Sequence, residues 1–315
     1  MRRFLAQMFG PSPAPGSSHP SQPMSGEVER LWTSSDGLKL SARDYAGAGG
    51  PARLPVICIH GLTRNSRDFE DVAPAIAATG RRVLSLDVRG RGRSTYDPNP
   101  TNYNPAVYAG DVIALMHEAG LSRAVFLGTS MGGLITTTLA TLRPDLVAGA
   151  ILNDIGPEIA TEGLTRIGSY VGTGGPAASW TEAAARTKAI NGSAHPHLAD
   201  PDWVRFARRG WREAAPGQVV LDYDPAIAQA FATAPAGAPQ ASPDLWPLFM
   251  ALALNRPLLL VRGGASDLLA ESTAERMQTL APHMRRIDIP GIGHAPTLDE
   301  PDARQAVLDF LADAP

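Results

Sequence analysis

Short, mainly apolar runs alternate along this chain with segments that repeat at the period of a helix. The apolar runs cover residues 55–59, 83–87, 124–127, 147–152, 258–261 and 287–289, and helical patterns cover 69–78 and 108–118. Runs of this length and composition are typical of strands that are buried on both faces. The alternation therefore predicts an α/β fold, with a mostly parallel central sheet and helices on both faces.

The alternation stops between about Gly156 and Leu252, over a length that indicates an inserted lobe rather than a loop. Near the start of the chain, the turn Ser35-Asp36-Gly37 predicts an antiparallel hairpin. The predicted organisation is a disordered N-terminal tail (1–26), a first part of the core (27–156), a helical cap (157–251) and a second part of the core (252–315).

A serine stands where one predicted strand turns into a helix. The sequence Gly128-Thr129-Ser130-Met131-Gly132 follows the apolar run 124–127 and precedes a helical pattern. The five-residue pattern alone is weak, because chance would supply roughly 0.2 copies in a chain of this composition. In its strand–turn–helix context it predicts a nucleophile elbow, which holds Ser130 exposed on a tight, strained turn.

An acid and a histidine follow in chain order. Asp267 lies just beyond the strand 258–261, and His294 follows the short strand 287–289. A histidine suits the task of taking the serine proton because its ordinary pKa lies near neutral pH, and a carboxylate orients the imidazole. Asp154, just past the strand 147–152, is an alternative acid.

The order Ser130, Asp267, His294, together with His60-Gly61-Leu62 after the strand 55–59, resembles the α/β-hydrolase superfamily over residues 27–315. The similarity is to its serine-nucleophile, cap-bearing branch of esterases and carbon–carbon hydrolases. It implies Ser130 as nucleophile, His294 as general base and then acid, and Asp267 as the orienting acid. Some members of the superfamily take the acid from the position of Asp154. The Gly-Gly-Gly variant of the oxyanion hole, found in another branch, is absent.

The same resemblance implies an oxyanion hole made by the backbone N–H groups of Leu62 and Met131. Two such donors stabilise the charge that develops on a carbonyl oxygen, and removal of one typically costs about 100- to 1,000-fold in rate. His60 and Asp87 are expected to support neighbouring loops. Arg89, Arg91 and Arg93 are expected to form a network in a turn.

Four of the five tryptophans fall in the predicted cap. Trp180, Trp203, Trp211 and Trp246 are candidates for a substrate pocket. Residues 203–211 have apolar positions at helical spacing with arginines on other faces, so the alternatives are a helix that packs its apolar stripe or a pocket wall. In the second case an arginine holds a substrate carboxylate. His195-Pro196-His197 lacks nearby carboxylate or cysteine partners, which predicts a surface turn rather than a metal site.

Composition narrows the function. The net charge of −3 with interspersed signs indicates no nucleic-acid surface, and no apolar run approaches the length of a transmembrane helix. Cys58 is the only cysteine, so no intrachain disulfide forms, and it is expected to pack as a small apolar side chain. We expect a cytoplasmic enzyme without cofactor, metal or membrane partner; the oligomeric state is left open.

The sequence thus predicts a serine hydrolase that acts on a small carboxylic ester or related acyl compound through an acyl-enzyme on Ser130. Its triad is shared with carbon–carbon hydrolases of the meta-cleavage-product type and with lactonases and acyltransferases, and these remain alternatives. A ligand receptor that has kept the fold without catalysis is the alternative of a different class.

Overall fold

An eight-stranded sheet organises the protein, for which a computed structural model describes residues 26–49, 53–229 and 244–315. Its order is β1-β2-β4-β3-β5-β6-β9-β10. The strands are β1 (Glu27–Thr33), β2 (Lys39–Tyr45), β3 (Val56–Ile59), β4 (Val83–Asp87), β5 (Ala124–Thr129), β6 (Val147–Asn153), β9 (Leu258–Gly263) and β10 (Arg285–Ile289). β2 runs antiparallel to β1 and β4, as the predicted hairpin requires, and the other pairs are parallel. The predicted disordered tail lies, apart from Gly26, outside the described residues.

Successive residues of the central strands face opposite layers. In β5, Ala124 and Phe126 belong to one apolar cluster, whereas Val125 and Leu127 belong to the other. Because side chains alternate across a strand, a strand that is apolar at every position must be covered on both faces. The uniformly apolar runs of the sequence therefore correspond to strands in the middle of three layers.

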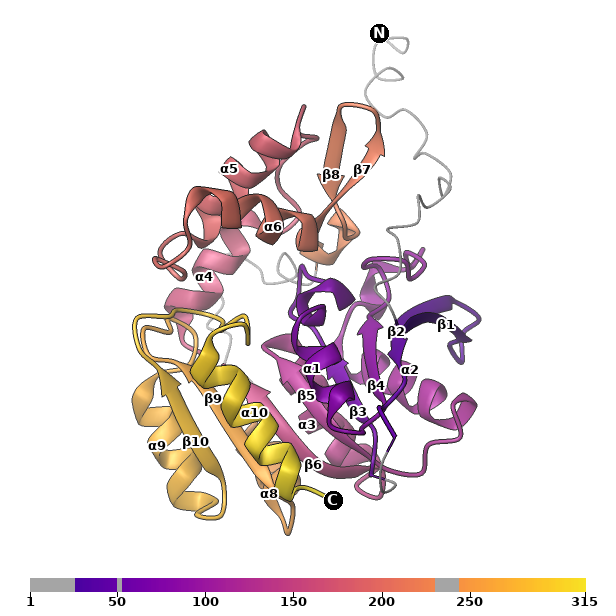
Figure 1. The fold of residues 1–315 in the computed structure, drawn as a ribbon, viewed down its shortest axis with the longest axis vertical. Helices are drawn as coiled ribbons and strands as arrows, with labels where there is room; N and C mark the ends of the chain where they lie inside the picture. Colours follow the sequence, from indigo (N-terminus) through magenta and orange to yellow (C-terminus); the bar gives the residue numbers. More distant parts are fainter. Residues whose placement is uncertain (1–25, 50–52, 230–243) are drawn as a thin grey trace, which may run out of the picture.

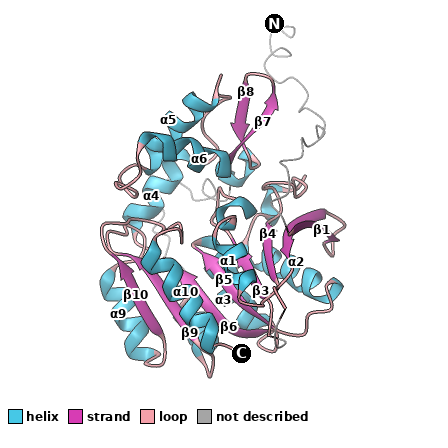
Figure 2. Ribbon diagram, in the orientation of Figure 1, coloured by secondary structure: helices cyan, strands magenta, loops and turns pink. Residues whose placement is uncertain are grey.

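Helices supply the two covering layers (Figure 1 and Figure 2). One face carries α1 (Val72–Ala78) and α10 (Pro301–Asp313), and the other carries α2 (Pro105–Glu118), α3 (Met131–Leu142), α8 (Trp246–Ala253) and α9 (Glu271–Leu280). The patterns at 69–78 and 108–118 correspond to α1 and α2. α2 begins earlier than the pattern because the Asn104 side chain accepts hydrogen bonds from the N–H groups of its first turn. No helix in the described ranges combines the length and apolarity needed to cross a membrane.

Residues 157–229, which we call the inserted segment, leave the sheet after β6. They form α4 (Thr161–Tyr170), α5 (Trp180–Asn191), α6 (Asp200–Gly210) and the hairpin β7 (Trp211–Ala215) and β8 (Gln218–Leu221). These elements lie beyond the carboxyl ends of the parallel strands (Figure 1). α8 instead packs against α3 in the helical layer of the core, so the predicted cap boundary at 251 falls inside a core helix.

Candidate active site

Ser130 lies on the turn between β5 and α3 in a backbone conformation that few non-glycine residues adopt. Its φ is 51° and its ψ is −115°. Two glycines allow this turn: a Cβ on Gly132 would lie 1.9 Å from the carbonyl oxygen of Ile59, and one on Gly128 would lie 2.4 Å from the Gly132 backbone. The start of α3 is therefore pressed against β3 and β5, and the serine is displayed at the carboxyl edge of the sheet.

Three side chains from three different loops join in one hydrogen-bonded chain at this edge. The Ser130 Oγ lies 2.9 Å from Nε2 of His294, and Nδ1 of His294 lies 2.8 Å from Oδ2 of Asp154. Asp154 is fully buried, and its carboxylate also accepts from the Gly263 N–H (2.8 Å) and from the Ser266 hydroxyl (2.7 Å). These bonds favour the tautomer in which Nδ1–H donates to Asp154 and Nε2 is free to accept the serine proton.

The acid beside His294 is thus Asp154, and the expectation for Asp267 is corrected. Asp154 comes directly after β6, which lies between β5 and β9 in the sheet, and its carboxylate meets the ring nitrogen of His294 that does not contact Ser130. Asp267 lies farther along the loop after β9, where Arg166 of α4 binds its carboxylate at 2.5 and 2.9 Å. This hydrogen bonding to Arg166 lowers the pKa of Asp267 below its ordinary value.

The two predicted oxyanion donors occupy the expected loops. Met131 is the first residue of α3, so its N–H is one of those that have no acceptor within the helix. Leu62 follows β3 and lines the same cavity as Ser130. Arg91, which is fully buried, ties both positions together: its Nε donates to the Leu62 carbonyl (3.0 Å) and its Nη2 contacts the Met131 sulfur (3.6 Å).

The supporting residues lie where the sequence indicated. His60 accepts from the Val88 N–H (3.1 Å), and burial lowers its pKa to about 4, which keeps the ring neutral. Asp87 accepts from the N–H groups of Ser66 and Arg93. Arg89 binds three carboxylates, those of Asp36, Asp97 and Asp111. Cys58 is buried within β3, and burial raises the pKa of its thiol.

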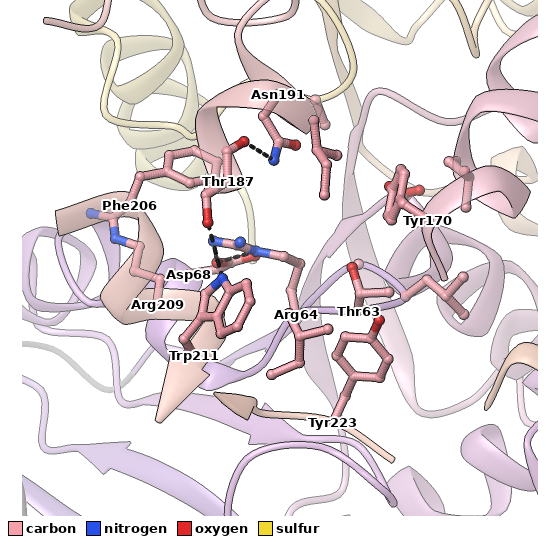
Figure 3. Close-up of a pocket in the computed structure, with 18 of the residues that line it drawn as sticks. Thr63, Arg64, Asp68, Tyr170, Thr187, Asn191, Phe206, Arg209, Trp211 and Tyr223 are labelled. Atoms are coloured by element: carbon pink, nitrogen blue, oxygen red, sulfur yellow. Dashed lines mark hydrogen bonds and ion pairs between the residues drawn. The ribbon is translucent and has the colours of Figure 1, made fainter. Parts of the chain in front are cut away.

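A cavity of about 540 Å³ opens over Ser130 and His294. This volume is typical of a site for a small molecule. Its walls come partly from the loop after β3, which contributes Leu62 and Arg64, and partly from the inserted segment (Figure 3). Among the residues the structure describes, no group of three or more histidine, cysteine, aspartate or glutamate side chains has the arrangement of a metal site.

Only one of the four predicted pocket tryptophans lines the cavity. Trp211, the first residue of β7 rather than a part of the preceding helix, does so. Trp203 is buried in the small apolar cluster of the inserted segment, and Trp180 lies under the Arg208 guanidinium at 4.3 Å. Trp246 belongs to α8, donates to Glu158 (2.7 Å) and stacks with Arg276 (3.9 Å). Packing within and between helices, not ligand binding, accounts for these three.

Two arginines of α6, Arg205 and Arg209, bind carboxylates of the core. Arg205 and Arg209 pair with Asp71, which precedes α1, and Arg209 also reaches Glu70 (3.0 Å) and Asp299 (2.8 Å) of the core. These ion pairs hold α6 against the core. The expectation that a helix arginine is available for a substrate carboxylate therefore does not hold for this pair.

His195 corrects another expectation. It does not lie on a surface turn: it is 2% exposed and lines the cavity, with its ring 5.3 Å from that of Phe206. The backbone carbonyl of Ala194 accepts from the Gly293 N–H (2.8 Å), so the loop between α5 and α6 rests directly on the loop of His294. Burial lowers the pKa of His195 to about 3, and the ring is neutral at neutral pH.

The sequence did not indicate four further features of the site: Arg64, Asn153, Ser266, and the contacts of Arg91 with Leu62 and Met131. The side-chain amide of Asn153 donates to the Pro296 carbonyl (2.8 Å), and the backbone carbonyl of Asn153 accepts from the Ser130 N–H (2.9 Å). Asn153 therefore connects the turn of the serine with the loop of the histidine. Its position directly before Asp154, at the end of a buried strand, is the signal that could have identified it.

Comparison with known proteins agrees with this architecture. The family model of the alpha/beta hydrolase fold matches residues 55–301. A 3-hydroxybutyrate-oligomer hydrolase of Cupriavidus necator is 35% identical over 263 residues, which cover 82% of this chain and 88% of the relative. A 2-(acetamidomethylene)succinate hydrolase of Mesorhizobium japonicum is 27% identical, over 81% of this chain and 87% of its own.

A solved structure of an alpha/beta hydrolase from Novosphingobium aromaticivorans has a TM-score of 0.84 and 44% identity to this chain. It covers 92% of this chain and 99% of its own length. The family match over residues 55–301 includes the turn of Ser130 and the loop of His294. This chain belongs to the α/β-hydrolase family and is a hydrolase.

Proposed function

We propose that this hydrolase cleaves a small carboxylic ester through an acyl-enzyme on Ser130, with His294 as general base and Asp154 as the residue that orients it. The observation that carries the proposal is the continuous hydrogen-bonded chain from Ser130 through His294 to Asp154 at the floor of the cavity. A serine hydroxyl attacks a carbonyl at neutral pH only when a neighbouring base removes its proton, and this chain supplies that base.

In the first half-reaction, the Ser130 Oγ bonds to the ester carbonyl carbon while its proton moves to Nε2 of His294. The carbonyl oxygen becomes an oxyanion, for which the N–H groups of Met131 and Leu62 are the proposed donors. Collapse of this intermediate breaks the bond to the alkoxy oxygen, which leaves as an alcohol with the proton from His294. In the second half, His294 takes a proton from water, the resulting hydroxide attacks the acyl carbon, and Ser130 leaves with that proton.

The proposed substrate class follows from the 35% identical relative, whose name describes hydrolysis of 3-hydroxybutyrate oligomers. Such oligomers are joined by esters between the hydroxyl of one unit and the carboxyl of the next. We therefore propose a short ester of a hydroxy acid, or a close analogue, as the substrate. The cavity of about 540 Å³ suits one or two such units.

The test uses purified protein with a fluorophosphonate and with p-nitrophenyl butyrate. We expect one adduct, on the peptide that carries Ser130, and ester turnover that falls at least about 10⁴-fold in Ser130→Ala. Ser169→Ala is the matched control, because Ser169 is an exposed serine of α4 that bonds the Arg166 carbonyl. The control should retain both the adduct and the turnover.

The alternatives predict different outcomes. A carbon–carbon hydrolase would turn over a vinylogous ketone in preference to esters, and an acyltransferase would require an added alcohol for efficient turnover. A receptor would bind ligands without forming an adduct. Equal ester turnover by wild type and Ser130→Ala would overturn the proposed function.

A further inference from the structure

Arg64 presents a free edge of its guanidinium at the cavity. Its Nε lies 2.9 and 3.0 Å from the two carboxylate oxygens of Asp68, and its Nη2 lies 2.6 Å from one of them. This arrangement occupies two of the five N–H donors of the side chain. Nη1 donates to no acceptor among the described residues, and Arg64 lines the cavity.

Several contacts fix the position of the Arg64 guanidinium. Asp68 fixes its plane, and the Phe206 ring lies 4.7 Å from its central carbon. A Cβ on Gly210 would lie 2.9 Å from Nη1, so the glycine at the end of α6 leaves room for this atom. Figure 3 shows the side chain reaching in among Thr187, Phe206 and Trp211 of the inserted segment. Because these contacts already order the guanidinium, binding of a ligand costs little of the side-chain entropy of Arg64.

The free edge lies in the same cavity as the nucleophile. The Cβ of Ser130 and the Cγ of Arg64 lie 3.8 and 3.7 Å from the place that a Cβ on Gly61 would occupy. The two side chains therefore both start close to Gly61, and both line the cavity. A substrate of a few carbon atoms is long enough to meet both.

The charges around the cavity favour an anion at this edge. Of the lining residues that the structure describes, three are arginines (Arg64, Arg186 and Arg209) and one, Asp68, is acidic. Arg209 is engaged by Glu70, Asp71 and Asp299, and Arg186 by Glu182 and the Gly175 carbonyl. Arg64 is the lining arginine whose outer donors have no protein acceptor in the described part of the chain.

His195 provides a second, independent observation on the same cavity. Its ring is 2% exposed, and its Nδ1 has no hydrogen-bond partner in the described structure. The ring adds a neutral polar group to the wall and no charge, so it does not compete with Arg64 for an anion. An unsatisfied buried nitrogen in a ligand cavity indicates that polar ligand groups or water complete this wall.

We propose that Arg64 is a specificity-determining residue whose free guanidinium edge binds a carboxylate of the substrate while Ser130 attacks its ester. The inference rests on the proposed function, and it adds the substrate's charge: an ester that carries a free carboxylate, such as the terminal carboxylate of a hydroxy-acid dimer. A guanidinium fork matches a carboxylate in geometry and charge, and such bonds are among the stronger hydrogen bonds in proteins.

The experiment compares two substrates that differ only in charge. One is the ester-linked dimer of 3-hydroxybutyrate, and the other is the same dimer with its free carboxylate converted to a primary carboxamide. For each protein we measure kcat and KM for release of the first unit, and p-nitrophenyl butyrate reports on the catalytic chain itself. We expect wild type to prefer the carboxylate dimer.

In Arg64→Gln the ratio of kcat/KM for the carboxylate dimer to that for the carboxamide should fall about 10- to 100-fold. The loss should lie mainly in KM, because the carboxylate is remote from the bond that breaks. Arg64→Lys should keep part of the preference, since it keeps the charge without the fork. Arg186→Gln, a lining arginine already engaged by Glu182, should keep the wild-type ratio.

Failure of the inference is distinct from failure of the proposed function. Unchanged substrate ratios in Arg64→Gln, with both dimers hydrolysed, would overturn the role of Arg64 and leave the ester hydrolase intact. Equal losses in Arg64→Gln and Arg64→Lys on both dimers would also overturn it, because they would indicate a structural effect on the loop. If wild type hydrolyses neither dimer nor p-nitrophenyl butyrate, the proposed function is wrong.

Discussion

The carboxyl edge of the sheet and the inserted segment both surround the cavity, but they use their polar side chains differently. At the edge, Ser130 and Asp154 follow directly on strands, and His294 follows five residues after one. In the inserted segment, arginines such as Arg209 bind carboxylates of the core. A polar side chain at the end of a strand is thus a candidate for the active site from its position alone. In the inserted segment, the ion-pair partners of an arginine decide whether it is available to bind a ligand.

The largest effect should separate the two aspartates that the sequence left as alternatives. Asp154→Asn should lower kcat about 10⁴-fold, because an amide in place of the carboxylate no longer favours the tautomer of His294 that accepts the serine proton. Asp267→Asn should lower it less than about threefold, since its partner is Arg166. Steady-state hydrolysis of p-nitrophenyl butyrate measures both. The reverse order would contradict the proposal that Asp154 orients His294.

The next effect concerns the attachment of the inserted segment. Arg209 is 4% exposed and binds Glu70, Asp71 and Asp299, so Arg209→Gln removes the cation that these three carboxylates share, although Asp71 keeps Arg205 and Asp299 keeps Arg304. We expect the free energy of unfolding to fall by about 2–3 kcal/mol, below the range for fully buried pairs because the carboxylates are partly exposed. Urea unfolding followed by tryptophan fluorescence measures this change.

Arg205→Gln is the matched control for that measurement. Arg205 also pairs with Asp71, but its side chain is 59% exposed. Pairs of this exposure contribute about 0–1 kcal/mol. A loss in Arg205→Gln as large as that in Arg209→Gln would mean that burial does not determine how strongly α6 is held.

A smaller effect on catalysis should come from removing the hydrogen bond that Ser266 donates to Asp154. In Ser266→Ala, Asp154 loses the 2.7 Å hydrogen bond from the hydroxyl but keeps those from the Gly263 N–H and from His294. Loss of one hydrogen bond of this kind predicts a fall in kcat/KM of about 3- to 10-fold. Ser169→Ala, on exposed α4, serves as the reference. Identical kinetics in both variants would remove Ser266 from the site.

The smallest effect is a pH dependence of stability at Asp267. Hydrogen bonding to Arg166 lowers the folded-state pKa of this carboxyl. Its stabilisation is therefore present above the unfolded-state pKa and is lost as the pH falls through the lowered folded-state pKa. Asp267→Asn should cost at most about 1 kcal/mol at pH 7. In urea unfolding, the difference from wild type should shrink between pH 5 and pH 3; a difference that grows instead would contradict the assignment.

Some features could be predicted because they depend on local order along the chain. The elbow of Ser130 needs a strand, a tight turn with glycines and a helix, and all three are contiguous in the sequence. His294 and the apolar strands could be predicted for the same reason, because each depends on residues that are contiguous in the sequence. The match to the hydrolase family confirms the predicted fold class.

Other features depend on which segments the fold brings together, and the sequence alone could not decide them. Asp154 and Asp267 both follow buried strands, and the choice between them rests on β6 lying between β5 and β9. Trp203 and Trp211 share one helical pattern in the sequence, yet of these two only Trp211 lines the cavity. The sequence did not single out Arg64, because its contacts are divided between its own turn and α6.

The sequence by itself determined the fold class, the strand–turn–helix arrangement around Ser130 and the place of His294 after the last strand, because strand periodicity, glycine sterics and short turns act between neighbouring residues. Only the tertiary structure decided that Asp154 hydrogen-bonds to His294 and that Arg205 and Arg209 of α6 bind a carboxylate of the core. It also decided that Arg64 has guanidinium donors without a protein acceptor in the cavity, among the described residues. Pairing between distant segments decides these features, since a charged side chain is available to a ligand only where no protein group has already satisfied it.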